Sequence, residues 1–299
     1  MLAIYKKELR SYFTNAIAWV FMAFFLVLAG LFFFVYNLSG GYLDFSVVYG
    51  GMEIFFVLLL VPVLTMKSIA DEKHQKTDQL LFTSPVSIGK IVFGKYLALI
   101  SLFAIVILFV SIYPIILQNL AKASSAADGA TYTVNYAVAY GSTLGFFLMG
   151  CAYIAMGVFI SSLTESQVIA AVAIGVLDIF TMLMSGIANM LPSNKIFMLC
   201  FFIVLIALLA FCLNLWIHNV WISALVGIVA EIVLALLYIF FSAKFDGLLY
   251  KVLSAISFTD RYTNFTYGIL DLSALFYYFS VCFLFLFLTV QRIKKQRYN

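Results

Sequence analysis

The sequence predicts an all-α membrane protein, a polytopic bundle of helices with six to eight spans. Of its 299 residues, 65% are hydrophobic and only 10% are charged, whereas a soluble globular domain carries about 25% charged residues. The mean hydropathy of +1.12 agrees with this assignment. Such a chain cannot cover a water-facing surface with polar groups. The composition therefore excludes a soluble enzyme, a disordered protein and a nucleic-acid-binding protein.

Eight apolar stretches are long enough, or nearly long enough, to cross a bilayer. A helix rises about 1.5 Å per residue, so a hydrocarbon core of about 30 Å needs about 20 residues. The second stretch is the weakest because it contains Glu53 and Pro62. The sixth and seventh stretches share one run without charged residues. If one of these stretches is re-entrant, the number of membrane spans falls to six or seven. The stretches cover residues 16–36, 49–67, 92–117, 136–162, 166–190, 196–214, 220–242 and 272–291.

The distribution of Lys and Arg predicts that both termini lie in the cytoplasm. Cytoplasmic loops of membrane proteins carry an excess of these residues. With both termini inside, 12 of the 17 Lys and Arg residues lie on the cytoplasmic side and five lie outside. We therefore expect a multi-pass protein of the plasma membrane.

The N-terminal segment, residues 1–14, is predicted to be an amphipathic helix in the cytoplasmic interface. Its apolar residues recur at helical spacing, and Lys6, Lys7 and Arg10 lie on the other side. Such cations favour anionic headgroups, so membrane lipid is an expected partner. They also act as a positive flank that sets the topology. The apolar run that follows has 21 residues, more than the roughly 7–15 of a signal peptide, and is read as a retained first span.

The longest cytoplasmic segment, residues 66–90, is the most informative about function. It begins as a charged helix in which Glu72 precedes Lys76 by four residues, which is a favourable pairing. It then becomes apolar at Leu80 and Leu81 and stops at a Ser-Pro dipeptide, because the residue before proline disfavours a helix. A helix that ends in exposed leucines suits docking into a groove on a soluble partner. A solvated connecting loop would not need the leucines.

A resemblance to a known family rests on this segment and covers nearly the whole chain. After the amphipathic start, the first span and a short second span come Asp71-Glu72-Lys73, Lys76-Thr77-Asp78-Gln79-Leu80-Leu81, Ser84-Pro85-Val86 and Lys90-Ile91-Val92. The chain thereby resembles the permease subunit of type-2 ABC exporters, most closely the gliding-motility and nitrous-oxide-cluster type. That family usually has six spans, so the region 190–242 departs from its pattern.

The resemblance implies that the loop after the second span is a coupling helix that seats on a separate ATPase subunit. The implied contact residues are Glu72, Lys73, Thr77, Leu80, Leu81 and Pro85. ATP and Mg would be held by that ATPase, so no cofactor is expected in this chain. A second permease copy or a paralogue is an implied partner, and an accessory extracytoplasmic protein is compatible with the pattern.

Catalytic and metal-binding signatures are absent from the sequence. The only histidines, His74 and His218, lie on different loops. The four cysteines lie inside apolar runs and read as packing residues. Gly89–Lys95 fits the phosphate-loop pattern but is followed by Tyr96, where Ser or Thr is needed. We therefore predict that the chain is not an enzyme.

The residues Thr164-Glu165-Ser166-Gln167 match the tight cytoplasmic turn between the family's fourth and fifth spans. Locally, Thr164 is expected to cap the fifth span together with Gln167, with Glu165 in the first turn near the helix dipole. Glu165 is also a candidate for a second, minor contact with the ATPase.

Two outer segments differ in character. Residues 118–135 read as a flexible loop. Residues 243–271 place apolar side chains on one face of a helix, which predicts an interfacial helix followed by a polar break at Thr259–Tyr262. Related exporters carry external or re-entrant helices before the last span. By this resemblance the segment either forms an extracellular gate or covers the bundle.

Two acids are predicted near the middle of the membrane, Asp178 in the fifth stretch and Glu231 in the seventh. A charge at that depth costs at least about 2.5–3.5 kcal/mol. They either line a translocation path, form a proton-linked pair, or are neutral acids hydrogen-bonded between helices. Gly141 and Gly145 permit a close helix contact, within one chain or between two.

Three functions follow from these observations. The favoured one is the permease subunit of an ATP-driven exporter. The alternative is a proton-coupled secondary transporter that uses Asp178 and Glu231, and the third is a structural membrane anchor.

Overall fold

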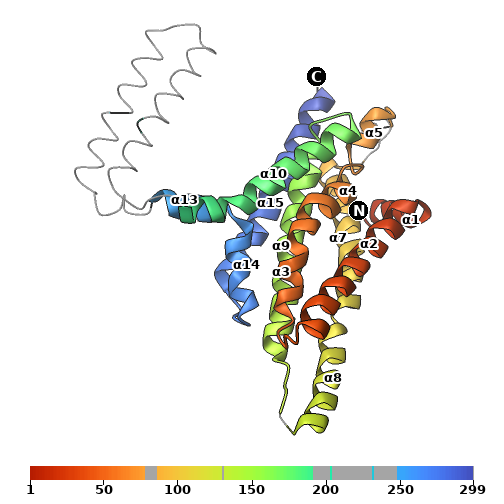
Figure 1. Ribbon diagram of the computed structural model, residues 1–299. Coiled ribbons are helices and arrows are strands. Elements are labelled where there is room, and N and C mark those ends of the chain that lie inside the picture. The colour runs from red at the N-terminus through yellow and green to blue at the C-terminus, as the bar shows by residue number, and fades with distance from the viewer. Residues whose placement is uncertain (78–85, 130, 191–202, 204–230, 232–247, 299) are drawn as a thin grey trace. The chain divides into compact units, whose positions relative to one another are not determined.

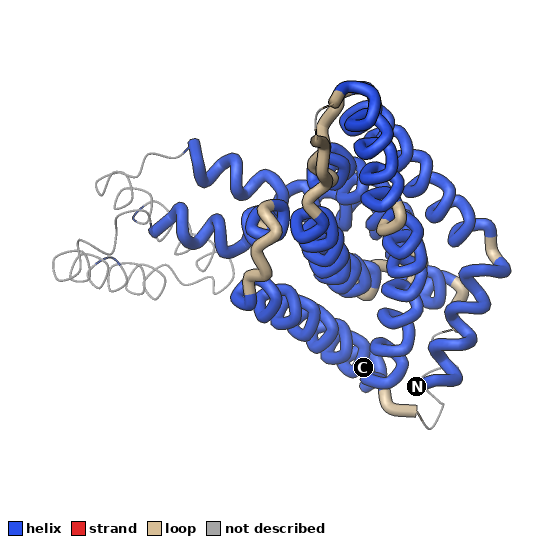
Figure 2. The backbone as a smooth tube through the Cα atoms, turned by 90° about the horizontal axis from the view of Figure 1, so that it is seen from below, coloured by secondary structure: helices blue, strands red, loops and turns tan. Residues whose placement is uncertain are grey.

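The computed structural model describes residues 1–77, 86–129, 131–190, 203, 231 and 248–298. The described residues form helices joined by short loops and contain no strand (Figure 2). They divide into two compact units, with Met1–Phe180 and Thr259–Asn299 in unit 1 and Thr181–Phe258 in unit 2. The all-α fold class is confirmed.

Unit 1 holds most of the described helices, which Figure 1 labels in chain order. Helix α10 begins in unit 1 and ends in unit 2, whereas α13 belongs to unit 2. The helices are α1 (Leu2–Thr14), α2 (Ala16–Phe32), η1 (Phe33–Ser39), α3 (Ser46–Phe55), η2 (Phe56–Leu60), α4 (Val61–Thr65), α5 (Ala70–His74), α7 (Ile88–Val110), α8 (Tyr113–Asp128), α9 (Tyr136–Ser161), α10 (Gln167–Met190), α13 (Leu248–Ile256), α14 (Phe258–Thr266) and α15 (Leu272–Tyr298).

Six helical segments of the described chain are long and apolar enough to cross a membrane. They correspond to the first five and the last of the eight predicted stretches. The sixth and seventh stretches lie outside the described residues, apart from Ile203 and Glu231. The chain is therefore a multi-pass membrane protein. The six segments are Ala16–Ser39, Ser46–His74, Ile88–Ala126, Tyr136–Ser161, Gln167–Met190 and Leu272–Gln296.

Four phenylalanines form the centre of unit 1. Phe25, Phe56, Phe103 and Phe146 come from α2, η2, α7 and α9, and each is fully buried. Every pair of these rings has its centroids between 5.0 and 6.4 Å apart, the range in which aromatic pairs attract each other. In a bilayer, where lipid is as apolar as the core, such packing holds helices together.

The second span is continuous but changes its hydrogen bonding along its length. The π-helical turn η2 ends at Leu60, and Pro62 follows in the first turn of α4. Proline has no N–H and its ring collides with the carbonyl four residues earlier. A local widening of the helix before Pro62 accommodates both effects. This explains why the stretch with Glu53 and Pro62 still spans.

The expectation of a flexible loop over residues 118–135 is wrong for its first half. Helix α8 continues through Lys122 to Asp128 and ends at Gly129, whose φ of 70° is left-handed. Alanine is the best helix former, and this segment is rich in it. Glycine at the end supplies the left-handed residue that commonly terminates a helix. The returning chain is fixed where Val134 N donates to Gln118 Oε1 at 2.7 Å.

The predicted polar break at Thr259–Tyr262 is also wrong, because these residues lie within α14. Ser257, which precedes α14, is fully buried and separates it from α13. Tyr262 is 3% exposed and its ring centroid lies 6.2 Å from that of Phe146. Tyr262 thus faces the bundle, whereas Thr263 and Asn264 of the same helix are exposed.

Candidate functional site

A buried charge network lies at the end of unit 1 that carries α1, α5 and the turn between α9 and α10. We call this the α5 end; the Lys and Arg distribution predicts that it faces the cytoplasm. Helix α1 runs crosswise to α7 and α9 there (Figure 1). The segment that the resemblance assigns to ATPase coupling starts at the same end.

The centre of the network is Lys95 of α7, which is 3% exposed. Its Nζ lies 2.7 Å from Glu72 Oε1 and 3.2 Å from Glu8 Oε1, and it donates to Ser68 O at 3.0 Å. An ammonium group has three donors, so these three oxygens satisfy all of them. A buried charge without such partners would be strongly unfavourable. Lys95 thereby joins α1, the turn after α4, and α5 to one atom of α7.

Glycine allows α1 to come this close to α7. A Cβ at Gly94 would lie 3.2 Å from Ile4 Cγ2 and 3.5 Å from Met1 O. Further along, the hydroxyls of Tyr5 and Ser101 are 2.9 Å apart. Gly94 belongs to the run that resembles a phosphate loop, and that run is helical from Ile88 onward.

The inner face of α1 differs from the expected lipid-facing surface. Tyr12 is buried, and this burial is the main cause that raises the pKa of its phenol. The nearby carboxylates of Glu8 and Glu72 raise it further. Glu8 itself is only 9% exposed. Sequence reasoning missed Glu8, although a signal was present. It lies three residues after Tyr5 and four before Tyr12, so a carboxylate sits on the apolar side of the helix.

The expectation of one charged helix from residue 66 onward is wrong. Helix α5 covers only Ala70–His74, and Lys76 has a left-handed φ of 55°. Glu72 therefore pairs with Lys95 instead of Lys76. An exposed i,i+4 pair contributes only about 0.2–0.5 kcal/mol, which is too little to outweigh the buried partner.

A second set of contacts joins α5 to the turn between α9 and α10. The buried ammonium of Lys73 donates to Ser162 O. Asp71 Oδ1 accepts from Gln167 Nε2 at 2.6 Å and from Gln75 Nε2 at 3.0 Å. Helix α5 is thus fastened to the bundle on two sides, through Glu72 to Lys95 and through Asp71 and Lys73 to the turn between α9 and α10.

The predicted capping of the fifth span needs correction. Helix α10 begins at Gln167, and Ser166 O accepts from Ala170 N at 3.0 Å, so the capping position belongs to Ser166. Thr164 Oγ1 donates to Ser166 O at 3.3 Å. Gln167 reaches Asp71 and does not return to the turn. Glu165 is exposed and precedes the first helical turn.

Ser161 fixes the chain between α4 and α5. Its Oγ accepts from Ile69 N at 3.2 Å and Ala70 N at 3.1 Å, and donates to Met66 O at 3.1 Å. We predict that Ser161→Ala lowers stability by about 2 kcal/mol, because a buried N–H without a partner costs about 1–3 kcal/mol. Thermal unfolding in detergent would measure this. Ser111→Ala is the control, since the hydrogen bond of Ser111 Oγ to Leu108 O stays within its own turn; equal stability of the two variants would contradict the prediction.

The structure brings only part of the predicted ATPase-contact set together. Glu72 bonds to Lys95 in the charge network, and Lys73 bonds to Ser162 O in the turn between α9 and α10. Thr77 is exposed, with its Oγ1 donating to Glu72 O at 3.3 Å. Leu80, Leu81 and Pro85 lie outside the described residues.

The two predicted membrane acids fall in different units. Asp178 of α10 is fully buried in unit 1. Glu231 is half-buried and belongs to unit 2. A path-lining or proton-linked role for either acid stays a prediction.

Sequence reasoning also missed the partner of Glu53, an acid buried within unit 1 one helical turn from Phe56. Glu53 of α3 is 6% exposed, and its Oε1 accepts from Thr259 Oγ1 at 2.6 Å. Helix α14 is therefore bonded to α3, which a reading of residues 259–262 as a polar break could not reveal.

The same helix packs on the glycines of α9. A Cβ at Gly145 would lie 2.6 Å from Phe265 Cβ, and one at Gly141 would lie 3.2 Å from Phe265 O. The close contact that these glycines permit is thus made within one chain.

Asp271 fixes the turn between α14 and α15. Its Oδ2 accepts from Asn264 Nδ2 at 2.7 Å and its Oδ1 from Ser273 N at 2.8 Å. These hydrogen bonds lower the pKa of the Asp271 carboxyl, and the bond from Asn264 has the largest effect. The Asp271 carboxylate, which caps the start of α15, therefore stays ionised at neutral pH. Its stabilising effect is lost only when the pH falls through this lowered pKa.

Comparison with known proteins identifies the family. Residues 34–196 match the family described as ABC-2 family transporter protein. This match covers more than half of the 299 residues and includes α5, Lys95 and the turn between α9 and α10. No curated protein matches the chain. The chain belongs to the ABC-2 family of transporter proteins and is a membrane-spanning permease of an ABC transporter.

Proposed function

We propose that this permease is the membrane subunit of an ATP-driven exporter, of the gliding-motility and nitrous-oxide-cluster type, and that it receives movement from a separate ATPase through residues 66–90. The observation that carries the proposal is the position of Lys95. It holds Glu72, at the base of the coupling segment, and Glu8 of α1 with one buried ammonium group. A displacement of α5 would therefore be passed to α1 and α7 together.

In this proposal the six predicted contact residues divide into two groups. Glu72 and Lys73 anchor the coupling segment, because their charged groups already bond within the chain. Thr77, Leu80, Leu81 and Pro85 meet the ATPase. The exposed Glu165 supplies the second contact, since its turn is joined to α5 through Gln167 and Asp71.

The rest of the mechanism follows from how ABC exporters are built. The ATPase subunits bind ATP and Mg, and their closure pulls on the coupling segments. Two permease halves are needed, so a second copy or a paralogue completes the assembly. Rigid movement of the joined helices would then reorient the spans between inward and outward access. Both termini and the coupling segment face the cytoplasm in this arrangement.

We predict that Leu80→Glu and Leu81→Glu each abolish association with the ATPase while membrane insertion is kept. A charged residue in an apolar groove removes the burial of a leucine, about 1.5–3 kcal/mol, and adds the cost of desolvating a carboxylate. Affinity purification of the tagged chain, followed by mass spectrometry, would detect the loss of the ATPase.

His74→Glu is the matched control, because His74 is exposed and lies in the same segment. This variant introduces the same acid without removing a leucine, so it should still associate with the ATPase. Normal recovery of the ATPase with both leucine variants would contradict the proposed contact.

A further inference from the structure

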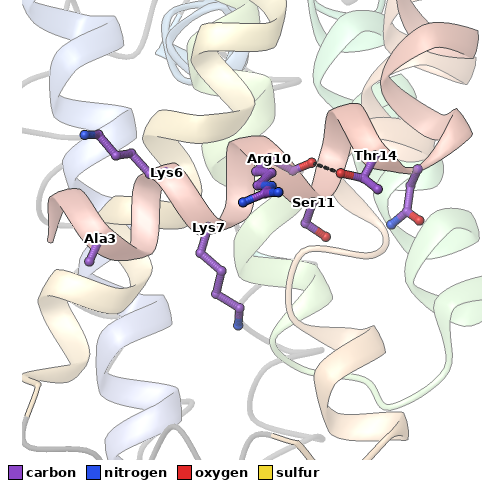
Figure 3. Close-up of a pocket in the computed structure, with 7 residues that line it drawn as sticks. Ala3, Lys6, Lys7, Arg10, Ser11 and Thr14 are labelled. Carbon is purple, nitrogen blue, oxygen red and sulfur yellow. Dashed lines mark hydrogen bonds between the residues drawn. The ribbon is translucent and has the colours of Figure 1, made fainter.

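One face of α1 is fully exposed and carries a cluster of cations. Ala3, Lys6, Lys7, Arg10 and Thr14 are exposed and recur at helical spacing, so they share one side of the helix. With Ser11 and Asn15 they line a hollow of about 570 Å³. Figure 3 looks onto this face and shows Lys6 pointing toward the top and Lys7 toward the bottom of the view, with Arg10 further along α1.

The charge of this face is not neutralised within the described part of the chain. Neither Lys6 nor Arg10 has an ion-pair partner among the described residues. Lys7 Nζ lies 3.9 Å from Glu8 Oε1 with its side chain 66% exposed, and such a pair contributes little. Glu8 is turned inward, where Lys95 holds it at 3.2 Å. The face therefore presents three cations and no exposed acid.

A hydroxyl lies among these cations. Ser11 is exposed and lines the same hollow as Arg10. The neighbouring Thr14 hydroxyl donates to Arg10 O at 2.7 Å, so its proton is already used. Guanidinium, ammonium and hydroxyl donors together suit the oxygens of a phosphate group.

The position of this face favours a lipid over a soluble partner. Helix α1 ends at Thr14 and the first span begins at Ala16, so the hollow borders the membrane. Trp19 is 59% exposed, and its Nε1 donates to Phe13 O at 3.0 Å. Tryptophan is enriched at the membrane–water interface, and Trp19 marks that level beside α1.

The neighbouring surface also suits acyl chains. Val20, next to Trp19 in the first span, is 58% exposed, and Leu2 at the start of α1 is 72% exposed. A phospholipid could place its phosphate against the cations and its chains along Trp19 and Val20. A soluble protein would have to cover a surface that continues into lipid.

We propose that the exposed face of α1 is a binding site for the phosphate headgroup of an anionic phospholipid, held by Lys6, Lys7 and Arg10 with Ser11. The bound lipid places its acyl chains along the start of the first span and holds α1 against the bilayer surface. The site is separate from the ATPase-coupling function and does not depend on it.

Trp19 provides a direct test on the full chain. The chain has three tryptophans, so a Trp216→Phe/Trp221→Phe variant reports from Trp19 alone. The protein is placed in phosphatidylcholine vesicles that contain brominated phosphatidylglycerol or, in the comparison, brominated phosphatidylcholine. We expect Trp19 to be quenched at a lower mole fraction of the anionic lipid than of the zwitterionic one.

Lys6→Gln/Arg10→Gln should remove this preference. One basic residue near an anionic surface contributes about fivefold in binding, so two contribute about 25-fold. Lys294→Gln/Lys295→Gln is the matched control, because both lysines are exposed on α15, and it should keep the preference. Lys6→Arg/Arg10→Lys keeps the charges and should also keep it, which separates lost binding from lost folding.

Other outcomes would overturn the proposal. Equal quenching by the two brominated lipids would show that no anionic lipid is selected, as expected for a face that serves only a soluble partner. A preference that survives Lys6→Gln/Arg10→Gln would place the site elsewhere. Equal quenching together with a change of Trp19 fluorescence on addition of inorganic phosphate would show a site for free phosphate and not for a lipid headgroup; we expect selective quenching by the anionic lipid.

Discussion

Lys95→Met is expected to lower the stability of the permease by about 3 kcal/mol and to uncouple α1 from α5. The variant removes a cation that is 4% exposed in its side chain, and the Glu8 and Glu72 carboxylates, 12% and 19% exposed, both lose it as a partner. Glu8 keeps only the long contact with the exposed Lys7, at 3.9 Å. Removing one member of a buried ion pair costs about 3–5 kcal/mol. The partial exposure of the two acids places the expected loss at the lower end. Thermal unfolding of the purified protein in detergent would measure it.

Three further variants make this prediction specific. Lys90→Met is the control, because Lys90 is exposed on the same helix, and it should be neutral. Lys95→Arg keeps a cation and should lose less stability than Lys95→Met. Glu8→Gln/Glu72→Gln/Lys95→Met removes every charge of the network and should recover part of the loss, since the cost comes from uncompensated charge. If Lys95→Met were as stable as Lys90→Met, the network would not hold the α5 end together.

The network also shows what the sequence could and could not predict. The fold class and six of the spans follow from apolar runs alone. The partner of Glu72 does not, because Lys76 and Lys95 are both available to it. Local spacing favours Lys76, but the choice depends on which lysine is buried beside the carboxylate, and that is a property of the tertiary structure. Glu8 could have been found, since an acid on the apolar side of an amphipathic helix needs a buried partner.

Helix α14 was missed for a related reason. In a soluble protein a polar run such as Thr259–Tyr262 indicates a turn. In a membrane protein polar residues can also face inward, where other polar groups meet them. Thr259 does this with Glu53. Both members of that pair were visible in the sequence, but 206 residues separate them, and no local pattern connects them.

Gly145→Leu is expected to separate α14 from α9 and to destabilise unit 1 by about 3 kcal/mol. Even a Cβ at this position would lie 2.6 Å from the Cβ and Cγ atoms of Phe265. These atoms are fixed close to the α14 backbone, and Phe265 is fully buried, so the helix itself must move. Overpacking a core costs about 1–3 kcal/mol, occasionally more. Gly50→Leu is the control, because a Cβ at Gly50 meets nothing within 4 Å. Thermal unfolding of the two variants gives the comparison.

A second substitution tests whether Phe265 is the cause. Phe265→Ala alone should cost about 3–5 kcal/mol because it leaves a cavity. In Gly145→Leu/Phe265→Ala the added leucine fills part of that cavity, so the double variant should lose less stability than the two single losses together, by about 1–3 kcal/mol. Because α9 and α14 meet within one chain, this recovery requires both substitutions in the same polypeptide. Co-expression of a Gly145→Leu chain with a Phe265→Ala chain should show no recovery, and recovery in that mixture would place the contact between subunits.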